Sequence, residues 1–117
     1  MPYRRTDRVN SLLQRELGTL ISEELTDPHI TFATVTAVET TADLRSARVH
    51  VSVLGDDEQR EETMRALGRA TPYLRRELGK RTELRSVPML QFVEDRTAAQ
   101  AARISELLRQ DREAHGS

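Results

Sequence analysis

The chain has 117 residues, of which 37% are hydrophobic and 32% are charged, and its formal net charge is −1. This length suits one domain with a single core. No apolar run approaches the roughly 20 residues of a membrane span. The N-terminus lacks the pattern of a signal peptide, and cysteine is absent. We therefore expect a cytoplasmic protein without disulfides, thiolate metal sites or membrane contact.

A helix and two strands are predicted in the first half of the chain. Apolar residues recur at helical spacing over residues 7–25, and Asp27-Pro28 ends this helix because a residue before proline is pushed out of the helical region. Residues 33–40 are rich in Thr and Val, and residues 46–54 alternate between apolar and polar side chains, as strands do. The short link between them predicts an antiparallel hairpin with one buried and one solvated face.

A proline interrupts the second helical region, which begins near Asp56 and stops near Gly79. Pro72 lacks a backbone N–H and clashes with the preceding turn, so it either kinks this helix or splits it in two. A third strand over residues 87–94 and a last helix from Thr97 follow.

The predicted fold is α+β, in the order α-β-β-α(kink)α-β-α, with helices covering one face of a three-stranded sheet. One domain spans residues 1–109. The polar residues 110–117 are expected to form a flexible C-terminal tail.

Charge is unevenly distributed along the second helical region. Residues 56–62, here called the acidic turn, carry five acids and one arginine, whereas residues 69–85 carry six basic residues and two acids. Arginine's planar fork suits paired contacts with phosphate oxygens, so a bent helix with this cluster is a candidate grip on an RNA backbone. The alternative is an ordinary solvated helix face. The predicted RNA-binding residues are Arg69, Arg75, Arg76, Lys80, Arg81 and Arg85.

Catalytic and metal chemistry finds little support. His29, His50 and His115 share no ligand spacing, and the acidic turn is expected to cap a helix rather than to bind a divalent ion. The glycines are too scattered for a phosphate loop, and no serine lies in a nucleophile motif. Phe32 and Phe92 are expected in the core, which leaves few aromatic side chains for base stacking. We expect no catalytic residue, no metal site and no cofactor.

A set of strings along the chain is distinctive in its order and spacing. It includes Glu24-Leu25-Thr26-Asp27-Pro28, Asp43-Leu44-Arg45-Ser46-Ala47-Arg48-Val49, Leu74-Arg75-Arg76-Glu77-Leu78-Gly79-Lys80-Arg81 and Leu84-Arg85-Ser86-Val87-Pro88. These strings resemble bacterial ribosome-binding factor A, and the resemblance runs from about Arg4 to Leu108. It implies a type II KH-like fold, in agreement with the predicted element order.

The resemblance also bears on how RNA would be held. Like that family, the chain lacks the Gly-x-x-Gly loop with which ordinary KH domains grip nucleotides. Ala70-Thr71-Pro72 stands where the family has an Ala-x-Gly kink. We therefore expect Pro72 to fix the angle between the two halves of the helix.

The function that the resemblance implies is that of a small-subunit assembly factor. Such a factor binds free or precursor 30S subunits, assists 16S rRNA maturation, including processing of its 5′ end, and supports growth in the cold. The implied partners are the 30S subunit, 16S rRNA and, functionally, assembly GTPases. No catalysis is implied, and a monomer is expected. The alternative is an adaptor that contacts ribosomal proteins through the acidic turn.

Overall fold

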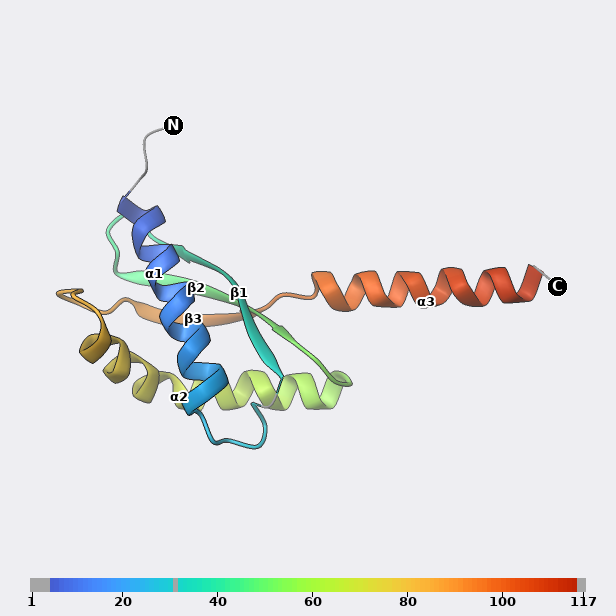
Figure 1. Ribbon diagram of the computed structural model, residues 1–117, viewed down its shortest axis with the longest axis horizontal. Coiled ribbons are helices and arrows are strands. Elements are labelled where there is room, and N and C mark those ends of the chain that lie inside the picture. Colours follow the sequence, from blue (N-terminus) through green and yellow to red (C-terminus); the bar gives the residue numbers. More distant parts are fainter. Residues whose placement is uncertain (1–4, 31, 116–117) are drawn as a thin grey trace.

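The computed structural model describes residues 5–30 and 32–115. Its helices and strands follow the predicted order, which confirms the α+β class. They are α1 (Arg5–Thr19), the π-helical turn η1 (Leu20–Glu24), β1 (Ala33–Thr40), β2 (Ser46–Val53), α2 (Asp57–Arg81), β3 (Met89–Glu94) and α3 (Thr97–His115), arranged as in Figure 1.

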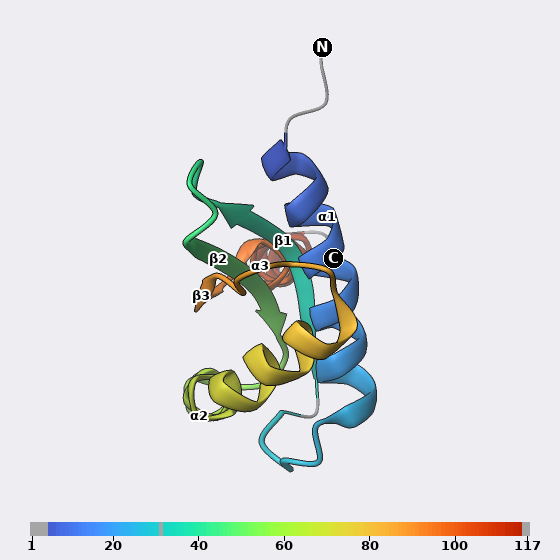
Figure 2. The ribbon, with the colours of Figure 1, turned by 90° about the vertical axis from the view of Figure 1, so that its left-hand side faces the viewer.

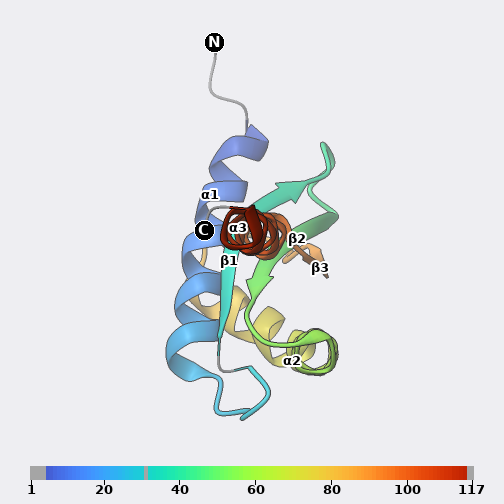
Figure 3. The ribbon, with the colours of Figure 1, turned by 90° about the vertical axis from the view of Figure 1, so that its right-hand side faces the viewer.

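The central strand of the sheet is β2. It pairs with β1 in antiparallel fashion, as the hairpin predicted, and with β3 in parallel. Alternate side chains of β2 are buried, namely Ala47, Val49, Val51 and Val53. On this face α1 packs beside β1 and α2 packs beside β3, whereas the opposite face of the sheet is not covered by either helix (Figures 2 and 3). The predicted one-sided helical layer is thus made by α1 and α2.

The first helix ends differently from its prediction. We predicted one helix over residues 7–25, but the α-helix stops at Thr19 and a wider turn follows, in which the Leu25 N–H bonds to the Leu20 carbonyl at 3.1 Å. The Thr19 hydroxyl donates to the carbonyl four residues earlier at 3.2 Å, a type of bond that perturbs the helical ladder. Leu20 and Ile21 are both buried in this wider turn and add to the core.

The long helix α2 is continuous but changes direction around Pro72. Figure 2 shows its first half nearly end-on and its second half running across the view. Because Pro72 has no N–H, the Gly68 carbonyl loses its usual intrahelical donor. Leu67 and Leu74, before and after the proline, are both fully buried, so both halves are held on the same core. Of the two outcomes that the sequence left open, the structure has the kink and not the split.

The last helix, α3, extends away from the rest of the protein (Figure 1). Its apolar residues Ile104, Leu107 and Leu108 are more than half exposed, so it does not add to the layer over the sheet. It runs to His115, so residues 110–115 of the predicted C-terminal tail are helical, and residues 116–117 lie outside the described part of the chain. Its 19 residues exceed the roughly 12–15 below which an isolated helix is marginal, so the helix can continue without a packing surface.

The start of α3 is attached to the sheet by Asp95. Its carboxylate accepts hydrogen bonds from the Thr97 backbone N–H at 3.0 Å and from the Thr36 hydroxyl at 2.8 Å. The hydrogen bonds from Thr97 and then Thr36 lower the pKa of Asp95 from its usual 3.8 to about 2. The ionised carboxylate therefore connects β1 to the first turn of α3.

We expect Asp95→Asn to lower the free energy of unfolding at neutral pH and to flatten its pH dependence. The folded-state pKa lies below the unfolded-state value, so the carboxylate stabilises the fold above about pH 4 and loses this contribution as the pH falls towards about 2. Thermal unfolding followed by circular dichroism across this range measures the effect. Thr36→Val removes one donor and should give an intermediate profile. An identical pH profile for Asp95→Asn and wild type would contradict this role.

Candidate nucleic-acid interface

Three of the predicted basic residues lie along one exposed face of α2. Arg69, Arg76 and Lys80 are seven and four residues apart, which places them on nearly the same side of the helix, with the bend between the first two. Arg69 reaches Asp27 only at 4.0 Å, and the Lys80 side chain is 74% exposed. Arg76 is exposed and makes no hydrogen bond or ion pair with any residue that the structure describes. We call these three residues the basic stripe.

Arg75, next to the stripe, points into the protein. Its Nε donates to the Pro88 carbonyl at 3.1 Å, and its Nη2 donates to the Val87 carbonyl at 2.8 Å. Charged donors of this kind form stronger bonds than neutral ones, so they hold the loop between α2 and β3 against the second half of α2. The Arg75 guanidinium therefore has a structural role within the fold.

Arg81 is also engaged within the chain. Its guanidinium pairs with Glu24 of η1, and this hydrogen bond raises the pKa of Arg81. The Tyr73 hydroxyl lies 3.4 Å from the other oxygen of Glu24. Burial, followed by the charges of Glu77 and Glu24, raises the pKa of Tyr73. Glu24 thus connects the end of the first helical segment to the second half of α2, a role that its sequence position does not reveal.

Arg85 lies in the loop that Arg75 holds in place. It is exposed and has no hydrogen bond or ion pair within the described part of the chain. A shallow hollow of about 420 Å³ lies nearby, lined by Pro72, Arg75, Arg76 and Val87.

The six predicted RNA-binding residues therefore fall into two groups. The side chains of Arg75 and Arg81 bind other parts of the same chain and stabilise the fold. The residues that present their charge to solvent are Arg69, Arg76, Lys80 and Arg85.

The acidic turn begins α2. The Asp56 carboxylate accepts from the Gln59 N–H at 2.8 Å, and the Gln59 side chain accepts from the Asp56 N–H at 2.8 Å. This reciprocal capping box confirms the predicted helix cap.

His29 and His50 pair with carboxylates from other elements. His29 lies 2.9 Å from Glu62, and His50 lies 2.6 Å from Glu39. Among the residues that the structure describes, no group of three His, Asp or Glu side chains could hold a metal ion. None of the described helices is both long and apolar enough to cross a membrane.

The two phenylalanines have different environments. Phe92 packs against the core, as predicted. Phe32 is 64% exposed, so its predicted core position is wrong. Ala33 pairs with Val53, whose side chain is buried, and Phe32 stands one residue outside this pair. Because side chains alternate along a strand, Phe32 faces away from the core. The alternation over residues 46–54, continued across the hairpin to the strand that pairs with it, is the sequence signal that places Phe32 on the exposed face.

Comparison with known proteins identifies the family. The family model described as ribosome-binding factor A matches residues 5–108. The chain belongs to the ribosome-binding factor A family. The ribosome-binding factor A of Desulfitobacterium hafniense is 45% identical over 109 residues, which cover 93% of this chain and 87% of the relative.

Solved structures of ribosome-binding factor A share the fold. The crystal structure of the Thermus thermophilus factor is 30% identical, with a TM-score of 0.71 over 79% of this chain and 97% of that one. A homology model of the Thermus thermophilus factor, fitted into a cryo-EM map of a 30S complex, is 32% identical, with a TM-score of 0.62 over 74% of this chain and 90% of that one. These likenesses confirm the predicted KH-like fold.

Proposed function

We propose that this chain binds the free or precursor 30S subunit and assists maturation of 16S rRNA, including processing of its 5′ end. The observation that carries the proposal is family membership over residues 5–108, joined to a structural relative that was fitted into a 30S complex. The action is non-catalytic: the protein holds RNA in a shape that other enzymes process. It works in the cytoplasm as a monomer, supports growth in the cold, and is functionally linked to assembly GTPases.

The proposed contact surface combines the basic stripe with Arg85. These side chains are exposed on both sides of the bend and in the adjacent loop. The chain has no Gly-x-x-Gly loop, so binding rests on cationic side chains that contact phosphate groups and recognise shape more than base sequence.

We expect Arg76→Glu combined with Arg85→Glu to weaken binding to purified 30S subunits without unfolding the protein, because neither side chain has a partner in the described fold. Each lost phosphate contact should flatten the slope of log affinity against log salt by about 0.7 to 0.9. Co-sedimentation across a salt series measures this slope.

The matched control is Arg65→Glu, which reverses an exposed charge on the first half of the same helix. It should leave the salt slope near that of wild type. Equal binding by wild type and the double variant at every salt concentration would remove the basic stripe from the interface. A direct role in maturation predicts that the double variant fails to reduce precursor 16S rRNA in cells that lack the wild-type protein and grow in the cold.

The adaptor hypothesis has weaker structural support when it rests on charge alone. Asp56 caps α2, Asp57 pairs with Arg60, and Glu62 pairs with His29. Much of the acidic turn therefore already has partners within the chain. A pull-down with RNase treatment separates the two functions. The adaptor would be favoured if binding to ribosomal proteins persisted after RNA removal and the Arg76→Glu, Arg85→Glu variant bound subunits as the wild type does.

A further inference from the structure

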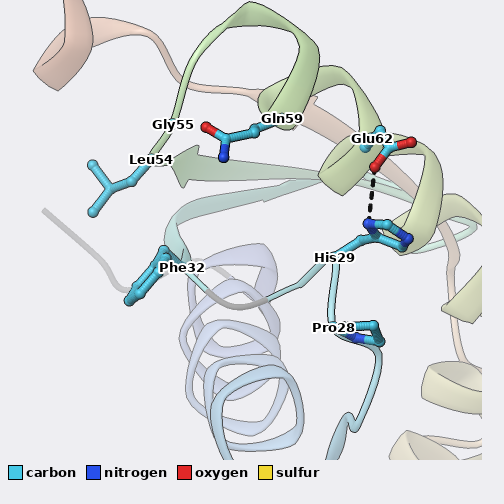
Figure 4. A pocket seen from close by; sticks show the side chains of 7 residues that line it. All are labelled: Pro28, His29, Phe32, Leu54, Gly55, Gln59 and Glu62. Carbon is cyan, nitrogen blue, oxygen red and sulfur yellow. Dashed lines mark ion pairs between the residues drawn. The ribbon is translucent and has the colours of Figure 1, made fainter.

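A pocket of about 520 Å³ lies at the open end of the β1–β2 hairpin, where β1 begins and β2 ends, beside the half of α2 that precedes the bend. Figure 4 shows its lining. One part is apolar, with Phe32 and Leu54 next to each other. Another part is polar, with Gln59 and the His29–Glu62 pair. The basic stripe does not contribute to this pocket.

The apolar part is formed by two cross-strand neighbours. The Leu54 N–H donates to the Phe32 carbonyl at 3.2 Å, which continues the β1–β2 pairing by one step. Phe32 is 64% exposed and Leu54 is 65% exposed, so two large apolar side chains stand together in solvent. Exposed apolar side chains that lie together in this way mark interaction sites on protein surfaces.

The polar part is held in place before any partner arrives. The Thr63 hydroxyl donates to the His29 carbonyl at 2.5 Å, and the His29 N–H donates to the Asp27 carboxylate at 2.9 Å. Gly55 has a φ of +124°, and a Cβ at this position would lie 2.7 Å from the Gln59 side chain, which folds back to complete the helix cap. A preformed site loses less conformational entropy when it binds.

The charge around the pocket discriminates between partners. The acidic turn borders the pocket and carries five acids against one arginine, a net charge of −4. A phosphate backbone would be repelled here, although Phe32 could stack on a base. Proteins that pack against RNA carry many lysines and arginines, and such a segment would be attracted to this rim.

We propose that this pocket is a second contact site of the bound protein, where an apolar side chain of a basic ribosomal protein segment inserts between Phe32 and Leu54 while flanking cations face the acidic turn. The proposal rests on the proposed binding to the small subunit. It divides α2 into two binding regions: the first turns, which carry Gln59 and Glu62, contact protein, and the basic stripe from Arg69 onward contacts RNA.

Photo-crosslinking tests this site in the full chain. The photoreactive residue p-benzoylphenylalanine replaces Phe32, the protein is bound to purified 30S subunits, and the sample is irradiated. We expect a crosslink to a basic ribosomal protein that survives RNase digestion and that mass spectrometry identifies. Leu54→Ser and, separately, Glu58→Lys should each reduce its yield by roughly tenfold, the scale of a central interface contact.

The matched control is Met89→Ser. Met89 is 60% exposed, comparable to Leu54, but does not line this pocket, so the crosslink should persist in this variant. A crosslink to rRNA alone, or none from protein that still co-sediments with subunits, would overturn the second contact site and leave the proposed function intact. Loss of co-sedimentation by the wild-type chain would instead remove both proposals.

Discussion

Arg75→Met is expected to lower the free energy of unfolding by about 3 kcal/mol, because two charge-assisted hydrogen bonds to loop carbonyls are lost at once. The Val87 and Pro88 carbonyls accept these bonds at 2.8 and 3.1 Å, and Pro88 is fully buried, so water replaces the lost donors poorly. Urea unfolding followed by circular dichroism measures the change.

The matched variant is Arg76→Met, at the adjacent position. It should change stability by less than about 0.5 kcal/mol, as is usual for an exposed side chain without partners, and yet weaken binding to 30S subunits at moderate salt. The two neighbours thus separate a structural arginine from a candidate binding arginine. If Arg75→Met proves as stable as Arg76→Met, the loop does not depend on this guanidinium.

Leu74→Ala is expected to cost about 3 kcal/mol of unfolding free energy, within the range found for fully buried leucines. Leu74 follows the bend directly and is fully buried, so its truncation loosens the half of α2 that carries Arg76 and Lys80. Affinity for 30S subunits should therefore fall as well, even at temperatures where the variant remains folded. Thermal unfolding and co-sedimentation on the same preparation measure both effects.

Pro72→Ala provides the comparison. Alanine would allow a helical hydrogen bond worth about 1 kcal/mol, whereas a straight helix would lift Leu74 and Leu78 from the core at a cost of several kcal/mol. Core packing of Leu74 and Leu78 therefore outweighs the hydrogen bond. Although the sequence predicts that Pro72 fixes the angle, the structure leads us to expect that the bend persists in this variant, with a stability change of about 1 kcal/mol or less. A straightened helix in this variant would show that the proline itself imposes the angle.

Local patterns were sufficient for most of the fold. The Thr- and Val-rich run over residues 33–40 coincides with β1, and the alternation over residues 46–54 predicts β2 and its buried face within one residue. Asp56 caps α2 as its position before a helical pattern suggests. These features depend on side-chain periodicity and on hydrogen bonds between residues close together in the chain. Both can be predicted from the sequence.

The candidate site was harder to predict because charge alone does not show where a side chain points. Arg75 and Arg76 are chemically identical neighbours, but Arg75 donates hydrogen bonds to the loop between α2 and β3, whereas Arg76 is exposed to solvent. Glu24 lies 57 residues from Arg81 in sequence, and no local pattern connects the two.

By itself, the sequence determined the family, the order of helices and strands, and the presence of an interruption at Pro72 followed by a basic segment. Only the tertiary structure decided which arginines remain exposed to solvent. It also decided that the interruption is a bend, with Leu67 and Leu74 buried on either side of it, and that Phe32 and Leu54 lie next to each other with exposed side chains. The physical reason is that periodicity shows only on which face of its own helix or strand a residue lies. Which carbonyl or carboxylate that residue then contacts depends on segments far away in the sequence that pack against the same face.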